Sequence, residues 1–191
     1  AYTPDYKVSK DIENSVMRNI LERVLDSLQK KETPYLGILG IDCVLTGDGQ
    51  FVTLDFKPFL ADHDAEAVLN LVDENLLTLF EACAVGSFAD DYNYIETKDE
   101  FAVAGVLSSG RVKNSIIEGL DDLQDNTIVA HLNTKRNEYL EYETQGSNAL
   151  VVTTTAKTLS RAKKALYEEL EFIEFEGKKY RKDICNSSEA W

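Results

Sequence analysis

The sequence predicts an α+β fold, with an antiparallel sheet and helices followed by a small β-rich domain that ends in a helix. Three observations predict it: a helical apolar stripe near the amino terminus, a hairpin pattern at residues 35–56, and short β-like runs after about residue 98. Helical and strand periods occur in separate stretches of the chain, which is typical of an α+β fold rather than an alternating one.

The first element is an amphipathic helix that follows an irregular arm, Ala1–Val8. Ser9 is a suitable N-cap, and the helix ends before Pro34. Every fourth residue is apolar, which places one stripe toward the core: Ile12, Val16, Ile20, Val24 and Leu28.

A β-hairpin is expected next. Tyr35–Thr46 and Phe51–Phe56 have strand-like composition, and Gly47-Asp48-Gly49 lies between them as the turn. Gly37 and Gly40 within the first run indicate the close approach of a backbone or a ligand.

Two helices broken near Asp73 are predicted over Ala65–Val85, and Gly86–Lys98 has no clear period and is a candidate linker. We therefore divide the chain into domains 1–98 and 99–191. Short strands follow in the second domain, and Thr158 is expected to cap a last helix with a regular apolar face. The expected strands are Phe101–Leu107, Thr127–Leu132, Tyr139–Thr144 and Ala149–Thr155.

The composition excludes several classes of partner. A net charge of −14 over 191 residues argues against nucleic acid and anionic membranes, both of which are bound through basic patches. The sequence has no run of about 18 apolar residues and no signal-peptide pattern, so we expect a cytoplasmic protein. Because the chain begins at Ala1, it is either trimmed of its initiator or a piece of a longer polypeptide.

Cysteine and histidine give no metal or catalytic motif. Cys43, Cys83 and Cys185 are odd in number and lack metal-ligand spacing, which predicts free thiols in a reducing compartment. His63 and His131 are far apart in sequence, so we expect a surface and a structural histidine rather than a catalytic pair.

The candidate site lies in and after the second hairpin strand. Asp55 is the best metal-ligand candidate, and Lys57 lies on the same sheet face because strand side chains alternate. Asp62 and Asp64 follow on a loop. In a chain this acidic, such a loop is more often a solvated turn than a metal site.

Five segments spread in order over the whole chain resemble the carboxyl-terminal part of glycinamide ribonucleotide synthetase, the phosphoribosylamine–glycine ligase family. They include Ala-Tyr-Thr-Pro at residues 1–4, Pro-Tyr-Leu-Gly at 34–37 and His-Leu-Asn-Thr at 131–134. The others are Gly-Ser-Asn-Ala-Leu at 146–150 with Val152-Thr153, and the closing segment Phe175–Ile184. Each segment alone is a weak signal, but their common order is specific.

The resemblance implies an ATP-grasp ligase that uses ATP and Mg²⁺ to join glycine to phosphoribosylamine. Domain 1–98 would be the end of the ATP-grasp domain, and domain 99–191 the carboxyl-terminal domain of the family. The missing amino-terminal domains would precede Ala1 in the same polypeptide. Gly105, Gly110 and Gly119 are too dispersed to form a triphosphate loop, so the chain alone should be inactive.

Residue by residue, the resemblance places Asp55 at a glutamate that binds magnesium in the family and Lys57 at its asparagine ligand. Asp62 matches the family aspartate and Asp64 its glutamate, which implies a nucleotide or substrate role; no catalytic residue can be assigned. Asp keeps a hard oxygen ligand for Mg²⁺, whereas the Lys57 ammonium repels the ion.

Three hypotheses stay open. The chain is the end of a divergent ligase, or a non-catalytic relative that keeps the scaffold for binding. The third is a ligase with an altered substrate, in which Asp42 on the neighbouring strand supplies the lost metal ligand.

Overall fold

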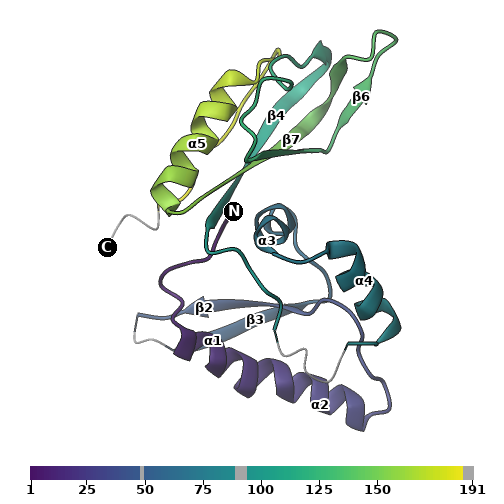
Figure 1. Cartoon of the computed structure of the whole chain (residues 1–191), viewed down its shortest axis with the longest axis vertical. Coiled ribbons are helices and arrows are strands. Elements are labelled where there is room, and N and C mark those ends of the chain that lie inside the picture. The colour runs from purple at the N-terminus through teal and green to yellow at the C-terminus, as the bar shows by residue number, and fades with distance from the viewer. Residues whose placement is uncertain (48–49, 89–93, 187–191) are drawn as a thin grey trace. The chain divides into compact units, whose positions relative to one another are not determined.

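The computed structural model describes residues 1–47, 50–88 and 94–186 (Figure 1). The chain packs into two compact units, neither continuous in sequence. The carboxyl unit comprises Ala1–Pro4, Asp62–Asp73 and Thr97–Trp191, and the amino unit comprises Asp5–Ala61 and Glu74–Glu96. The chain passes for the last time from the amino unit to the carboxyl unit after Glu96, close to the domain boundary expected near residue 98. A division into domains 1–98 and 99–191 stays a prediction.

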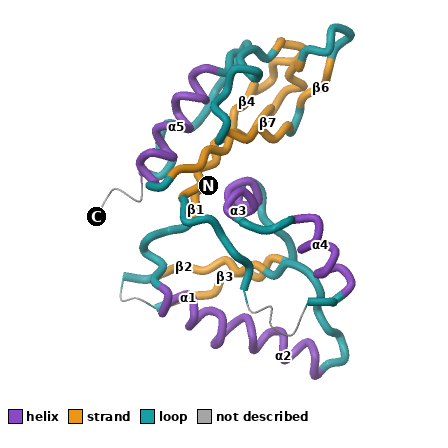
Figure 2. Tube along the Cα trace, viewed as in Figure 1, coloured by secondary structure: helices purple, strands orange, loops and turns teal. Residues whose placement is uncertain are grey.

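The carboxyl unit is built on an antiparallel sheet, shown in orange in Figure 2. Within the described residues its path runs through four strands, and a fifth, β6, also pairs with β7. The strands are β1 (Tyr2–Thr3), β4 (Phe101–Ile116), β7 (Tyr142–Ala156), β5 (Thr127–His131) and β6 (Thr134–Arg136).

Strands β4 and β7 are longer than the sequence predicted. The runs expected at Tyr139–Thr144 and Ala149–Thr155 are one strand, and β4 continues nine residues past Leu107. Gly146 has a φ of +90°, a value typical of turns, but it lies inside β7. The register between β4 and β7 shifts several times in this region. The extra residues are absorbed as β-bulges, which bend a strand without ending it.

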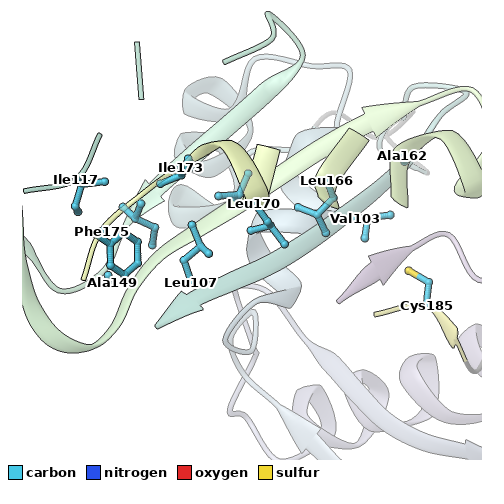
Figure 3. Close-up of a cluster of buried hydrophobic side chains, with 12 residues drawn as sticks. Val103, Leu107, Ile117, Ala149, Ala162, Leu166, Leu170, Ile173, Phe175 and Cys185 are labelled. Atoms are coloured by element: carbon cyan, nitrogen blue, oxygen red, sulfur yellow. The ribbon is translucent and has the colours of Figure 1, made fainter. Parts of the chain in front are cut away.

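Helix α5 (Leu159–Phe172) covers one face of this sheet. The Thr158 hydroxyl accepts a hydrogen bond from the Arg161 amide at 3.3 Å, which confirms the predicted cap. Figure 3 shows Leu166 and Leu170 of α5 with Val103 and Leu107 of β4 in the core, and all four are fully buried. The predicted apolar face of the last helix is therefore its core face.

A glycine and a buried carboxylate hold α5 in place. A Cβ at Gly105 would lie 3.1 Å from Leu166 and from Leu170, so glycine permits the close approach of helix and strand. Glu169, only 4% exposed, accepts hydrogen bonds from the Gln124 amide and the Thr127 hydroxyl, each at 3.0 Å. Both donors come just before or at the start of β5, so Glu169 ties the helix to the edge of the sheet.

Helix α3 (Asp64–Leu71) covers the opposite face of the same sheet. Its buried residues Ala67 and Leu71 pack against small side chains of the central strands, Ala102, Ala104 and Val151. Side chains at successive positions of β4 alternate between the two helices, as the strand period requires. The sheet is therefore buried on both faces. Asp64, expected on a loop, is the first residue of α3, and Asp62 lies in the turn just before it.

In the amino unit, the predicted helix begins where expected, because the Ser9 hydroxyl caps it by accepting from the Ile12 amide at 3.4 Å. It runs through α1 (Lys10–Val16), a π-helical segment at Met17–Leu21 and α2 (Glu22–Lys30). Every residue of the predicted stripe is half-buried, whereas its neighbours on the helix are mostly exposed. The stripe assignment is confirmed.

The hairpin and the last helix of the amino unit have the predicted type. Strands β2 (Gly40–Leu45) and β3 (Phe51–Lys57) pair antiparallel, but β2 begins five residues later than the predicted run Tyr35–Thr46, and Gly37 precedes it. The turn residues 48–49 lie outside the described part of the chain. Helix α4 (Leu76–Val85) is separate from α3, as the predicted break near Asp73 requires. Among the described residues of this unit, Leu79 alone is fully buried.

Replacing Leu166 with alanine should remove a large part of the contact between α5 and the sheet. Leu→Ala at a buried site leaves a cavity, and the expected loss in the free energy of unfolding is about 2–5 kcal/mol. Urea unfolding followed by circular dichroism measures it. Leu140→Ala is the matched control: Leu140 is 71% exposed, so its change should stay below about 0.5 kcal/mol. Equal effects would contradict the core assignment.

Backbone amides of β7 should exchange with solvent far more slowly than those of α2. Strand β7 contains a continuous fully buried run, Ala149–Thr154, whereas α2 has no fully buried residue. Exchange follows the free energy of local opening, which grows with buried contacts. Hydrogen–deuterium exchange with mass spectrometry compares the two segments within one sample, and similar rates would show that the amino unit is held by contacts not apparent in its burial.

Candidate functional site

The β2–β3 hairpin brings three charged side chains together. Asp42 lies directly opposite Asp55 in the strand register, and Gly40 lies opposite Lys57. Asp55 and Lys57 are two residues apart on β3 and therefore lie on one face, as the sequence predicted. The register adds Asp42 to this face, so two carboxylates and one ammonium group meet across the two strands.

The Lys57 ammonium group contacts both carboxylates. Lys57 Nζ lies 2.7 Å from Asp55 Oδ2 and 3.5 Å from Asp42 Oδ2. The Lys57 side chain is 29% exposed, against 51% and 59% for Asp42 and Asp55. The lysine side chain is thus the most covered of the three, and we call the set Asp42, Asp55 and Lys57 the hairpin charge cluster.

The protonation of the cluster follows from these contacts. The hydrogen bond from Lys57, and then the one from the Phe56 amide to Asp55 Oδ1 at 2.9 Å, lower the pKa of Asp55. The hydrogen bond to Asp55 and the charge of that carboxylate raise the pKa of Lys57. Near neutral pH the cluster therefore holds a charged Lys57 beside a charged Asp55.

A divalent metal ion, which the resemblance implies at this strand, does not fit these residues. Both oxygens of Asp55 accept hydrogen bonds within the chain, one from Lys57 and one from Phe56. Asp42, the proposed replacement ligand, also lies beside Lys57. Within the part of the chain that the structure describes, no group of three or more His, Cys, Asp or Glu side chains could hold a metal ion.

Asp62 and Asp64 belong to the carboxyl unit, whereas Asp55 belongs to the amino unit. Both are exposed, and Asp64 is the first residue of α3, where a negative charge favours the helix amino terminus. Their role toward a nucleotide or substrate stays a prediction, as does the metal role of Asp55.

The two histidines have different surroundings, and neither interacts with a catalytic partner in the described residues. His131 Nδ1 lies 2.9 Å from the Thr134 hydroxyl, and its ring stacks on Tyr142 with centroids 4.1 Å apart. Burial, and then the charge of Arg136, lower its pKa. His63 precedes α3 with a φ of +69°, and its Nδ1 is buried without a hydrogen-bond partner among the described residues.

One feature was not predicted from the sequence: a cavity of about 280 Å³ within the carboxyl unit. His63 lines it together with residues from both ends of the described chain, among them Ala1, Arg181 and Cys185. Arg181 forms a two-point ion pair with Asp183, at 2.9 and 2.7 Å, on the rim. No sequence pattern could have indicated this cavity, because its lining residues are brought together only by the sheet.

The remaining observations concern cysteines and membrane spans. Cys43, Cys83 and Cys185 all lie within the described residues and form no disulfide. Burial, and then the charge of Asp42, raise the pKa of Cys43, which lowers its reactivity as a thiolate.

In the described residues, no helix has both the length and the apolar character needed to cross a bilayer.

Comparison with known proteins agrees with the motifs. Residues 107–187 match the family model "Phosphoribosylglycinamide synthetase, C domain". A phosphoribosylamine–glycine ligase of Halalkalibacterium halodurans is 33% identical over 100% of this chain and 44% of its own length. The trifunctional purine biosynthetic protein adenosine-3 of Chironomus tentans is 29% identical over 96% of this chain and 14% of its own length.

A solved structure gives the same result for the fold. The phosphoribosylamine–glycine ligase of Thermotoga maritima superposes with a TM-score of 0.72 at 24% identity, over 88% of this chain and 42% of that one. The chain thus spans less than half of the length of the ligases that it matches. Over its whole length the chain is similar to part of the phosphoribosylamine–glycine ligases, its residues 107–187 match the C-domain model of that family, and it shares the fold of the Thermotoga maritima ligase.

Proposed function

We propose that this chain is the carboxyl-terminal part of an ATP-dependent carbon–nitrogen ligase of the phosphoribosylamine–glycine ligase type, acting in cytoplasmic purine biosynthesis. The observation that carries the proposal is the match to such ligases over the whole chain. In the complete enzyme, ATP would activate the glycine carboxylate as an acyl phosphate, which the amine of phosphoribosylamine would capture.

The chain by itself would be inactive. It supplies 44% of the length of the bacterial ligase, and its sequence contains no glycine-rich loop that could hold a triphosphate. Its partners would be the remaining domains of the same polypeptide and the small molecules ATP, glycine and phosphoribosylamine. Nucleic acid and membrane partners do not suit a net charge of −14.

A second candidate function is favoured by one observation, the contact of 2.7 Å between Lys57 and Asp55. In a non-catalytic relative, the scaffold would serve for binding, and the strand that holds magnesium in the family would be free to carry a lysine. The same contact disfavours a ligase with Asp42 as replacement ligand, because Lys57 also engages Asp42.

The purified chain should not form ADP from ATP when glycine and phosphoribosylamine are both supplied. The reason is that its sequence contains no glycine-rich loop that could hold a triphosphate. A coupled ADP assay, with phosphoribosylamine generated in the reaction and the Halalkalibacterium halodurans ligase as positive control, measures the rate. ADP formation that requires both substrates would show that these 191 residues suffice for catalysis.

Titration calorimetry of the complete gene product with ATP, with and without Mg²⁺, separates the two candidate functions. A ligase should bind the nucleotide with micromolar affinity in a magnesium-dependent way, whereas a non-catalytic scaffold should give no heat at millimolar ATP. The bacterial ligase, measured under the same conditions, controls for nucleotide quality. Binding would remove the scaffold function, and its absence would remove the ligase function.

A further inference from the structure

We infer that the ammonium group of Lys57 is the resident cation of the hairpin charge cluster, and that it takes the place of a divalent metal between Asp42 and Asp55. The inference concerns only the cation preference of this hairpin. It does not depend on whether the complete protein is a ligase or a scaffold.

The register of the hairpin creates the need for a cation. Asp42 and Asp55 lie directly opposite each other on antiparallel strands. Like charges in this position destabilise strand pairing, because their Cβ atoms are separated by only about 5 Å. A positive charge that contacts both carboxylates removes the repulsion, and Lys57 Nζ has this position, at 2.7 Å from Asp55 and 3.5 Å from Asp42.

The backbone places this cation without help from other elements. Lys57 lies two residues after Asp55, so its side chain leaves the sheet on the face that carries the carboxylates. Its partner across the ladder is Gly40, which has no side chain to compete for the same space. The lysine stem can therefore lean along the strand toward Asp55, in agreement with its low exposure of 29%.

Lysine and a metal ion exclude each other here because they need the same oxygen atoms. Mg²⁺ requires nearly octahedral coordination by oxygen and loses its water ligands reluctantly. One carboxylate oxygen of Asp55 accepts a hydrogen bond from Lys57, and the other accepts one from the Phe56 amide. Asp42 and Asp55 together are therefore a poor metal site. The ammonium also repels any approaching dication.

The inference predicts that removing the ammonium opens the hairpin to metal. Mn²⁺ serves as the probe, because its binding is read directly from the loss of the free-ion signal in electron paramagnetic resonance. The wild-type chain should show no binding that depends on Asp55. Lys57→Asn, which supplies an amide oxygen, should bind Mn²⁺ with an affinity about tenfold or more above wild type, since a repelling charge is replaced by a ligand.

Three control variants make the test specific. Lys10→Asn removes the same charge from an exposed ion pair with Glu13, so it should not gain Mn²⁺ affinity. Lys57→Arg keeps the cation and should behave as wild type. The double variant Lys57→Asn with Asp55→Asn should lose the gain.

Thermal unfolding provides a second readout. Without metal, Lys57→Asn should unfold at a lower temperature than Lys10→Asn, because the two opposed carboxylates are then uncompensated, and Mn²⁺ should restore part of the loss. If Lys57→Asn fails to fold by circular dichroism, Lys57→Gln takes its place. Mn²⁺ binding by wild type that Asp55→Asn abolishes would overturn the inference, and so would a folded Lys57 variant that gains no affinity.

Discussion

The pairing of β4 with β7 is the interaction on which the carboxyl unit depends. These two strands form the centre of the sheet, and their side chains alternate between a face covered by α5 and a face covered by α3. The short strands β1, β5 and β6 each pair with one of the two. Because the apolar surface on both faces is removed from water at this pair, it supplies most of the driving force for folding of the unit.

The same sheet explains why residues remote in sequence share one unit. Residues 1–4 add a strand to β4, and residues 62–73 supply the helix on its second face. Asp62 and Asp64, just before and at the start of α3, thereby belong to the carboxyl unit, whereas Asp55 and Lys57 belong to the hairpin of the amino unit.

At the hairpin, the strand register rather than the number of acidic residues decides which charged side chains meet. Acidic side chains are abundant in this chain, and the pairing of Asp42 with Asp55 sets two of them opposite each other within reach of one lysine. A shift by one residue would move Asp55 and Lys57 together to the other face of the sheet and separate both of them from Asp42. The positive charge of Lys57 is therefore compensated locally, by two carboxylates of the same hairpin.

Much of the fold could be predicted because its signals are local. Ser9 and Thr158 cap helices through their own hydroxyl groups, and apolar residues at every fourth position select the buried helix face whatever lies against it. The full length of β4 and β7 could not be predicted, since Gly110 and Gly146 have the composition of turns and only the opposite strand converts them into bulges. Strand β6, three residues long, has no pattern of its own.

The sequence by itself determined the helices, the hairpin, the family and the proximity of Lys57 to Asp55, because each depends on short spacings or on motifs in order. Tertiary structure alone decided that Asp42 joins them, that α3 and residues 1–4 belong to the carboxyl unit, and that His63 lines a cavity with Arg181 and Cys185. These facts rest on pairing between distant segments. Such pairing is selected because it buries the apolar surface of the whole sheet, so no short stretch of sequence predicts it.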